Sequence, residues 1–120
     1  MFKFETLEIW KETINFASQT YKKTKKFPSY ENFGLISRLN RAAVSISLNI
    51  AEGTSRSSNT DFKRFIQMSI GSLNEVVSCL YIAKEQNYIS NSTFDACYNK
   101  CEQISKMLYG FMKHLSSKYH

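Results

Sequence analysis

The 120-residue chain has only one proline and four glycines, which argues against a loop-rich or all-β fold. It has no run of about 18 apolar residues, so we expect no membrane span. Charges at Lys3, Glu5 and Glu8 interrupt its start and argue against a secretory signal. We therefore expect a single cytoplasmic domain over residues 1–120, with three reduced cysteines.

Residues that commonly carry catalysis or metal binding are scarce. The two histidines, His114 and His120, are not grouped with other ligands, and no glycine-rich phosphate loop is present. Cys97 and Cys101 are four apart and could bind a metal with two further ligands. Both, however, fall on an apolar stripe, where thiols act as small hydrophobic side chains, and the same explains Cys79. We expect no catalytic residue, metal or cofactor.

Apolar residues recur at alternating spacings of three and four, which predicts helices at approximately 7–26, 30–52, 60–87 and 92–116. The predicted core stripe of the first helix is Leu7, Trp10, Ile14, Ala17, Tyr21 and Thr24. That of the third is Phe62, Ile66, Ser69, Leu73, Val76, Leu80 and Ala83. That of the fourth is Phe94, Cys97, Cys101, Ile104, Leu108, Phe111 and Leu115. Short connections favour an all-α, antiparallel up-down four-helix bundle.

Polar residues at the expected helix starts predict caps. The candidates are Thr6, Ser29, Ser58 or Asn59, and Ser90 or Asn91. Gly53 is predicted to end the second helix in a left-handed conformation. Gly71 interrupts the third helix at a cost of about 1 kcal/mol, which suggests close packing there.

The second helix is apolar on more sides than one bundle core can cover. One stripe is Leu35, Leu39, Ala42 and Ile46, a second is Ile36, Ala43 and Ile50, and a third is Val44 and Leu48. A helix that is apolar nearly all round is buried on several sides. We therefore predict a homo-oligomer whose interface includes Ile36, Ala43, Val44, Leu48 and Ile50.

Asn49 and Glu52 interrupt this apolar helix, and buried polar groups need partners. Arg38, Arg41 or a neighbouring subunit could supply them. The two residues could form a polar site, but a structural role that fixes the packing register is the favoured interpretation.

The formal net charge of +6 and a pI near 9.3 favour acidic partners. One basic group closes the first helix and continues on the second, and the other surrounds a serine-rich loop. The residues expected to contact phosphate, without reading sequence, are Lys22, Lys26, Arg38, Arg41, Arg56, Lys63 and Arg64. Tyr21, Tyr30 and Tyr119 could stack on unpaired bases. A solvated basic face is the alternative.

The run RLNRAAVSISLNIAEG, followed by Arg56, Ser58 and DFKRFIQMSIGSLNEV, resembles the four-helix-bundle family of 23S rRNA intervening-sequence proteins. The accessory variability proteins of diversity-generating retroelements have a similar bundle. The resemblance runs from about Leu7 to Tyr88, and residues 49–53 are its most specific part. Ser47 and Lys63 depart from the family, which often has proline and usually an apolar residue there.

The resemblance implies a homopentamer with a nucleic-acid-binding role. Our leading hypothesis is a non-enzymatic, homo-oligomeric protein that binds RNA or DNA or acts as a scaffold. The alternative is a protein-interaction adaptor that works through a reverse transcriptase or another partner protein, and an enzyme is a distant third.

Overall fold

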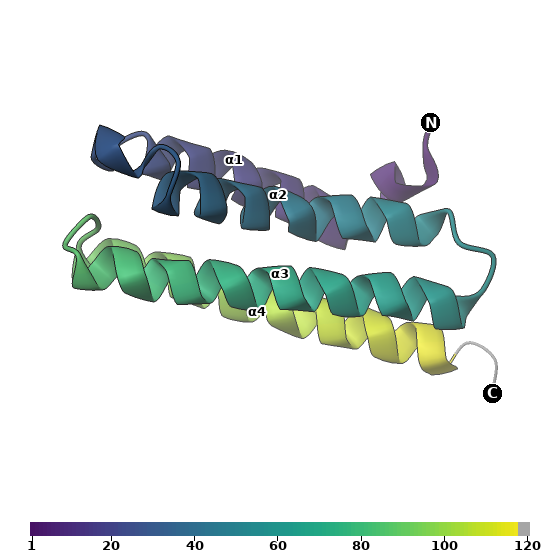
Figure 1. Cartoon of the computed structure of the whole chain (residues 1–120). Coiled ribbons are helices and arrows are strands. Elements are labelled where there is room, and N and C mark those ends of the chain that lie inside the picture. The colour runs from purple at the N-terminus through teal and green to yellow at the C-terminus, as the bar shows by residue number, and fades with distance from the viewer. Residues whose placement is uncertain (118–120) are drawn as a thin grey trace.

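The computed structural model describes residues 1–117, and these contain helices and turns but no β-strand. Four long helices follow one another: α1 (Glu8–Thr24), α2 (Leu35–Thr54), α3 (Asn59–Glu85) and α4 (Asn91–Ser117) (Figure 1). Short 3-10 helices lie at Lys3–Thr6 and Ser29–Glu31. The prediction of an all-helical protein with four helices is confirmed. His120, Tyr119 and Lys118 lie outside the described residues.

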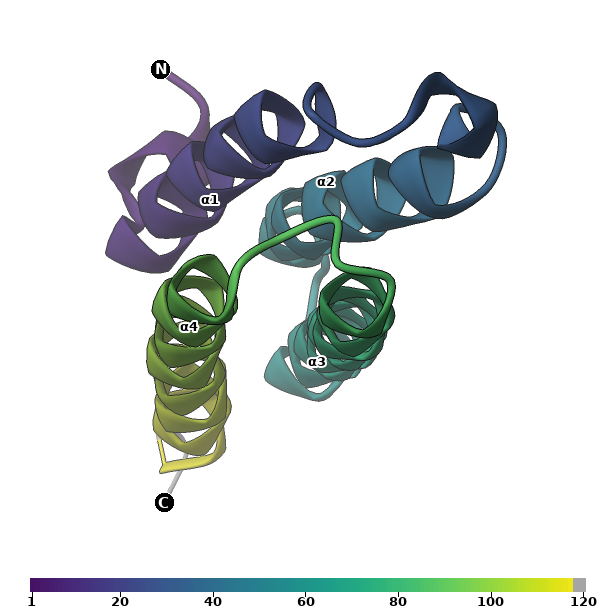
Figure 2. The ribbon, with the colours of Figure 1, turned by 90° about the vertical axis from the view of Figure 1, so that its left-hand side faces the viewer.

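The helices α1 and α2 form one layer, which lies on a second layer of α3 and α4 (Figure 1). The end-on view shows all four around a common centre (Figure 2). Side chains link successive helices: Thr24 Oγ1 at the end of α1 donates to Asn40 Oδ1 in α2 at 2.9 Å. Ser69 Oγ in α3 donates to the Ile46 carbonyl of α2 at 2.9 Å. Asn59, which opens α3, donates to the Leu115 carbonyl near the end of α4 at 3.0 Å.

The predicted core faces of α3 and α4 are confirmed almost residue by residue. Every member of the α3 stripe is buried except Phe62, and every member of the α4 stripe except Phe111. Those two half-buried rings contact each other edge to face, with centroids 5.3 Å apart. Regular spacing of large apolar residues is therefore sufficient to define these two faces.

The predicted buried face of α1 is wrong: the buried residues lie on a face that is rotated by part of a turn from the predicted stripe. Ile14 and Tyr21 are exposed, and the buried residues of α1 are instead Ile9, Thr13, Phe16, Ala17, Thr20 and Thr24. Thr13 and Thr20 are buried because their hydroxyls donate to the carbonyls of Trp10 and Phe16 within the same helix. A threonine whose hydroxyl is bonded in this way packs as an apolar residue.

The start of α2 differs from the prediction. The helix begins at Leu35 rather than near residue 30, because Ser29 lies in a separate 3-10 turn and caps nothing. The carboxylate of Glu31 takes the capping role: its Oε1 accepts from the Leu35 N–H at 3.0 Å. Its Oε2 accepts from the Tyr88 hydroxyl at 2.9 Å, so one side chain ties α2 to the turn between α3 and α4.

The other predicted caps have mixed outcomes. Ser58 caps α3 by accepting from the Asp61 N–H at 3.1 Å, and Ser90 accepts from the Thr93 N–H at the start of α4 at 3.1 Å. Both predictions are confirmed. The prediction that Thr6 caps α1 is wrong, because Leu7 occupies the N-cap position of α1 and forms no side-chain capping hydrogen bond. Asp61 and Thr93 supply the backbone donors that these serines satisfy.

Neither Gly53 nor Gly71 has the role expected of it. Gly53 is helical and buried within α2, which runs on to Thr54, so it does not end the helix in a left-handed conformation. A Cβ there would lie 2.6 Å from Cδ1 of Phe62 and 3.2 Å from Cβ of Phe65. At Gly71 a Cβ would meet nothing within 4 Å. The close approach therefore lies at the end of α2, where the helix meets the first turns of α3.

The helix α3 is long and apolar enough, by length and composition alone, to cross a membrane. The expectation drawn from uninterrupted apolar runs overlooked it, since α3 mixes apolar residues with serine, glutamine and asparagine. The core helix of a soluble protein passes the same test. In α3, 39% of the apolar window is buried, and its buried stripe packs on α2 and α4.

We expect the substitution Gly53→Ala to lower stability and Gly110→Ala to raise it. Overpacking typically costs about 1–3 kcal/mol, more than the roughly 1 kcal/mol that alanine gains over glycine in a helix. Gly110 is exposed in α4 with nothing within 4 Å of an added Cβ, so there alanine gains about 0.5–1 kcal/mol. Urea unfolding followed by circular dichroism measures both. Equal stabilisation by the two substitutions would show that Phe62 does not crowd Gly53.

Candidate nucleic-acid interface

The end of α1 carries an exposed group of lysines. Lys22 and Lys26 line a cavity of about 460 Å³ together with Lys23, and its opposite wall is formed by the turn between α3 and α4, at Tyr88 and Ser90. Among the described residues, neither Lys22 nor Lys26 forms an ion pair. Their charges are therefore available to an anionic partner.

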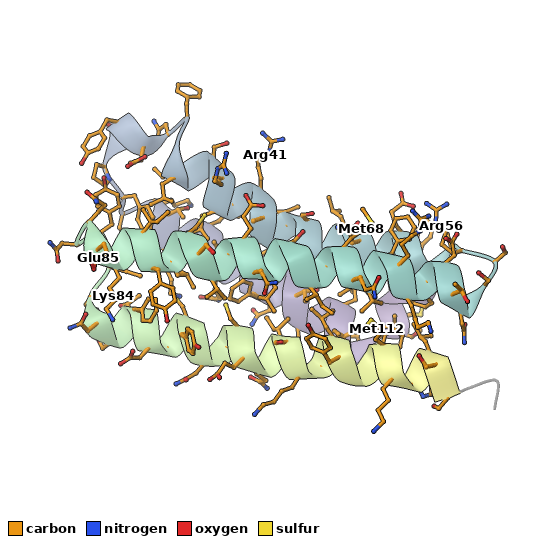
Figure 3. The ribbon with its side chains drawn as sticks, turned by 60° about the horizontal axis from the view of Figure 1, so that its bottom comes forward. Arg41, Arg56, Met68, Lys84, Glu85 and Met112 are labelled. Carbon is orange, nitrogen blue, oxygen red and sulfur yellow. The ribbon has the colours of Figure 1, made fainter. Side chains whose placement is uncertain are left out.

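Arg38 and Arg41 lie in the first two turns of α2, at the same end of the molecule as the lysines. The Arg38 guanidinium is 4.0 Å from the Glu75 carboxylate, and both side chains are largely exposed, so this pair is weak. Arg41 projects away from the bundle (Figure 3) and forms no ion pair within residues 1–117. Both arginines line a cavity of about 470 Å³ between α2 and α3, which we call the α2–α3 hollow.

The second predicted group lies at the opposite end and has intramolecular partners. Arg56 is 3.1 Å from Glu52, and Arg64 is 3.0 Å from Asp61. Both guanidinium groups also lie over the ring of Phe65, at 4.4 and 5.2 Å from its centroid.

Lys63 completes this group, and its ammonium donates to Ser116 Oγ at 3.1 Å. The charges of Arg56 and Arg64 are locally compensated, whereas those of Lys22, Lys26 and Arg41 are not. The two predicted groups are thus not equivalent.

The sequence analysis proposed Arg38 or Arg41 as partners of Asn49 and Glu52. Within residues 1–117, neither arginine forms a hydrogen bond or ion pair with them; their partners are closer in the sequence. The side-chain amide of Asn49 donates to the carbonyl of Ser45 at 2.9 Å and to Ser45 Oγ at 3.2 Å. Glu52 pairs with Arg56 one turn further along. The helix geometry explains both, because residues three and four apart on a helix are neighbours.

The residues predicted for the oligomer interface divide into three classes. Ala43 and Ile50 have no exposed surface, so for them the interface prediction fails: they pack inside the chain. Ile36 and Val44 are half-buried against the core. Leu48 is 59% exposed, and Met68 in α3 is 47% exposed.

Leu48 and Met68 belong to one surface. The bond from Ser69 to Ile46 and a 3.0 Å bond from Ser72 Oγ to Ser45 Oγ set a register that places position 48 of α2 opposite position 68 of α3. In Figure 3, Met68 and Arg41 project on the same side of the bundle. The sequence analysis did not single out Met68, although its place off the α3 core stripe was a signal.

Phe33 is the other residue that the sequence analysis missed. It is fully exposed, at 102% of its reference surface, and lies on the rim of the α2–α3 hollow. The signal was present, because Phe33 falls outside every predicted apolar stripe. Tyr30, which the sequence singled out, is also exposed, and its hydroxyl lies 3.1 Å from that of Tyr88. Tyr21 is exposed on α1.

The three cysteines are free and buried. Burial raises the pKa of the Cys101 thiol to about 12, and the neighbouring Cys97 adds to the effect. Burial also raises the pKa of Cys79 and of Cys97. Within residues 1–117, no group of three or more histidine, cysteine or acidic side chains is placed to hold a metal ion.

The fold and this surface define an all-helical, four-helix protein with a group of cations at one end, Lys22, Lys26 and Arg41, that form no ion pair among the described residues. The chain belongs to the 23S rRNA-intervening sequence protein family, whose model matches residues 5–110. The match confirms the resemblance read from the sequence and extends it into α4.

One similar solved structure is a protein with unknown function from the S23 ribosomal protein family of Bacteroides thetaiotaomicron. It is 22% identical, with a TM-score of 0.78, and the match covers 88% of this chain and 98% of that one. At this identity the likeness shows the fold alone. A comparison with curated proteins returns no significant match.

We expect all three thiols to react slowly with iodoacetamide in the native protein near pH 8, because the raised pKa values keep them protonated. Cys97 should react first, since it lines a small groove between α1 and α4, and Cys101 last. For Cys101 the stability gained from a neutral buried thiol is complete below its ordinary pKa of 9.0 and is lost as pH rises towards 12. Mass spectrometry after timed labelling tests this, with urea-unfolded protein as the control. Native Cys101 reacting as fast as in urea would contradict its burial.

Proposed function

We propose that this chain is a non-enzymatic, homo-oligomeric protein that binds RNA or DNA phosphates, or acts as a scaffold on them, through repeated basic patches. Each chain would be an antiparallel up-down bundle, and the assembly a pentameric ring in the cytoplasm. The hydrogen bonds between Asn59 and Leu115, and between Ser69 and Ile46, support antiparallel neighbours, because each joins positions at matching heights on helices of opposite direction.

The observation that carries the proposal is the uneven compensation of charge. Lys22, Lys26 and Arg41 lie at one end without ion pairs among the described residues, whereas Arg56 and Arg64 have partners. Cations without ion-pair partners lose no intramolecular ion pair when they bind a phosphate group. Contacts of this kind position a protein on a nucleic acid without reading its sequence.

Assembly would multiply the effect. The net charge of +6 per chain becomes about +30 in a five-chain ring. Weak phosphate contacts repeated around a ring add through effective concentration, with no new type of contact. Binding should then fall steeply as salt rises, because counterions are released from the nucleic acid.

We expect the double variant Lys22→Gln/Lys26→Gln to bind RNA and DNA more weakly and with a flatter salt dependence. Each lost phosphate contact lowers the slope of log K against log salt by roughly 0.7 to 0.9. Filter binding from about 50 mM salt upwards measures this.

The matched control is Arg56→Gln/Arg64→Gln, which removes the same charge from the compensated end and should have the smaller effect. Equal losses would mean that binding follows net charge alone. If the unmodified protein retains neither RNA nor DNA at about 50 mM salt, the proposal fails, and the adaptor for a reverse transcriptase or another partner protein takes its place.

Self-association through the outer face of α2 and α3 is supported by Leu48 and Met68, which are exposed and lie opposite each other. The variant Leu48→Glu should lower the mass measured by light scattering at micromolar concentration and keep its helical circular dichroism. Burying a leucine contributes about 1.5–3 kcal/mol, so each interface should weaken roughly tenfold or more. The control Ile14→Glu alters an exposed apolar residue on α1 and should leave the mass unchanged. An unmodified protein that is monomeric would refute the assembly.

A further inference from the structure

The α2–α3 hollow combines the chemical groups that a nucleotide presents to a protein. Arg38, Arg41 and three serines supply cationic and hydroxyl groups, and Phe33 stands at the rim. Its volume of about 470 Å³ falls within the roughly 300–1,000 Å³ of small-molecule sites. It also includes one carboxylate, Glu75, which pairs weakly with Arg38.

The exposed ring of Phe33 needs an explanation, because phenylalanine gains free energy by leaving water. Its 102% exposure means that no part of residues 1–117 covers it. The turn that carries it is held firmly, because Glu31 accepts from both the Leu35 N–H and the Tyr88 hydroxyl. Hydrogen bonding to Tyr30, burial and the neighbouring Glu31 raise the pKa of Tyr88 further above neutral pH. Phe33 is thus a ring on a fixed support beside two arginines.

Ser45, one of the residues that line the hollow, has both lone pairs of its hydroxyl engaged. Ser45 Oγ accepts from Asn49 at 3.2 Å and from Ser72 at 3.0 Å. A serine hydroxyl has two lone pairs and one O–H, so both lone pairs are used and the O–H remains to donate. Asn49 therefore acts as a positioning residue for Ser45, which connects the polar interruption of α2 to the hollow.

We propose that the α2–α3 hollow binds single-stranded nucleic acid one nucleotide at a time, with the base stacked on Phe33 and the phosphate held by Arg41. This inference rests on the proposed nucleic-acid-binding function and specifies its substrate as an unpaired strand. A duplex keeps its bases stacked on each other and cannot offer a base face to the ring, whereas an unpaired strand can. Arg41 provides the charge because Arg38 is shared with Glu75.

The test compares a single RNA strand of about twelve nucleotides without self-complementarity with the same strand annealed to its complement. Fluorescence anisotropy at several salt concentrations gives the affinities. We expect the single strand to bind more tightly than the duplex. Adenosine monophosphate should compete only at much higher concentration, because it lacks the neighbouring phosphates.

Phe33→Ala should weaken single-strand binding by about 5- to 150-fold, the usual effect of losing one stacked base. It should leave the salt slope unchanged, since no phosphate contact is lost. Arg41→Ala should instead flatten the slope by about 0.7. Glu75→Gln should strengthen binding, because it removes the negative charge that faces the phosphate.

Two matched variants separate stacking from other roles of the ring. Phe33→Leu keeps an apolar side chain without a π face and should lose affinity almost as Phe33→Ala does, whereas Phe33→Trp should retain it. Phe2→Ala removes an exposed ring near the N-terminus, at the other end of the molecule (Figure 1), and should have no effect. All variants should keep the helical circular dichroism of the unmodified protein, because these side chains are exposed.

Several results would overturn the inference. Equal affinity for strand and duplex, or full binding by Phe33→Leu, would exclude stacking while leaving phosphate binding intact. A change of oligomeric mass in Phe33→Ala would assign the ring to contact with a second copy of the chain. Competition by adenosine monophosphate at the strand's own concentration would assign the hollow to free nucleotides. If the unmodified protein binds no nucleic acid at low salt, the proposed function fails together with this inference.

Discussion

The packing of α2 against α3 is the constraint on which the rest of the structure depends. Ala43, Ile46 and Ile50 of α2 are completely buried, and Gly53 lets the end of the helix approach Phe62 so closely that a methyl group would not fit. Interiors packed this tightly tolerate little change in volume. Once these residues face inward, the opposite side of α2 is determined as well. Arg41, Ser45 and Leu48 must then lie on the outer side, beside the residues of α3 that share their height.

This arrangement accounts for the distribution of charge. Arg56 lies in the short turn between α2 and α3, and Arg64 lies early in α3. Each pairs with an acidic residue three or four positions before it, and both guanidinium groups lie over the ring of Phe65. The lysines that end α1 have no acidic neighbours of this kind. Cations without ion-pair partners therefore lie where α1 ends and α2 begins, and their charges can attract an anionic partner to that end.

The same end also carries an aromatic side chain that the fold leaves exposed. Phe33 is exposed in a turn that lies between Glu31 and Leu35, and Glu31 accepts hydrogen bonds from the Leu35 N–H and the Tyr88 hydroxyl. Leu48 and Met68 remain exposed further along the same face. Surface apolar residues grouped beside charged ones are typical of binding surfaces. One face of the α2–α3 pair thus offers an aromatic ring, cations and an apolar patch in sequence, while the three cysteines stay buried.

The sequence by itself determined the four helices, the buried faces of α3 and α4, and the family, and it narrowed the caps of α3 and α4 to two neighbouring residues each. Each follows from local spacing or local chemistry. The pairs Glu52–Arg56 and Asp61–Arg64 were also within its reach, since they join residues one helical turn apart. Only the tertiary structure decided which face of α1 is buried. Threonines whose hydroxyls bond to their own helix pack as apolar residues, so the spacing of apolar residues alone does not define that face. The tertiary structure also decided where α2 begins, since Glu31 depends on Tyr88, 57 positions along the chain. The exposure of Phe33 and Leu48 was settled in the same way: a residue is left in water or covered according to which helix packs beside it, and the sequence pattern of one helix does not contain its neighbours.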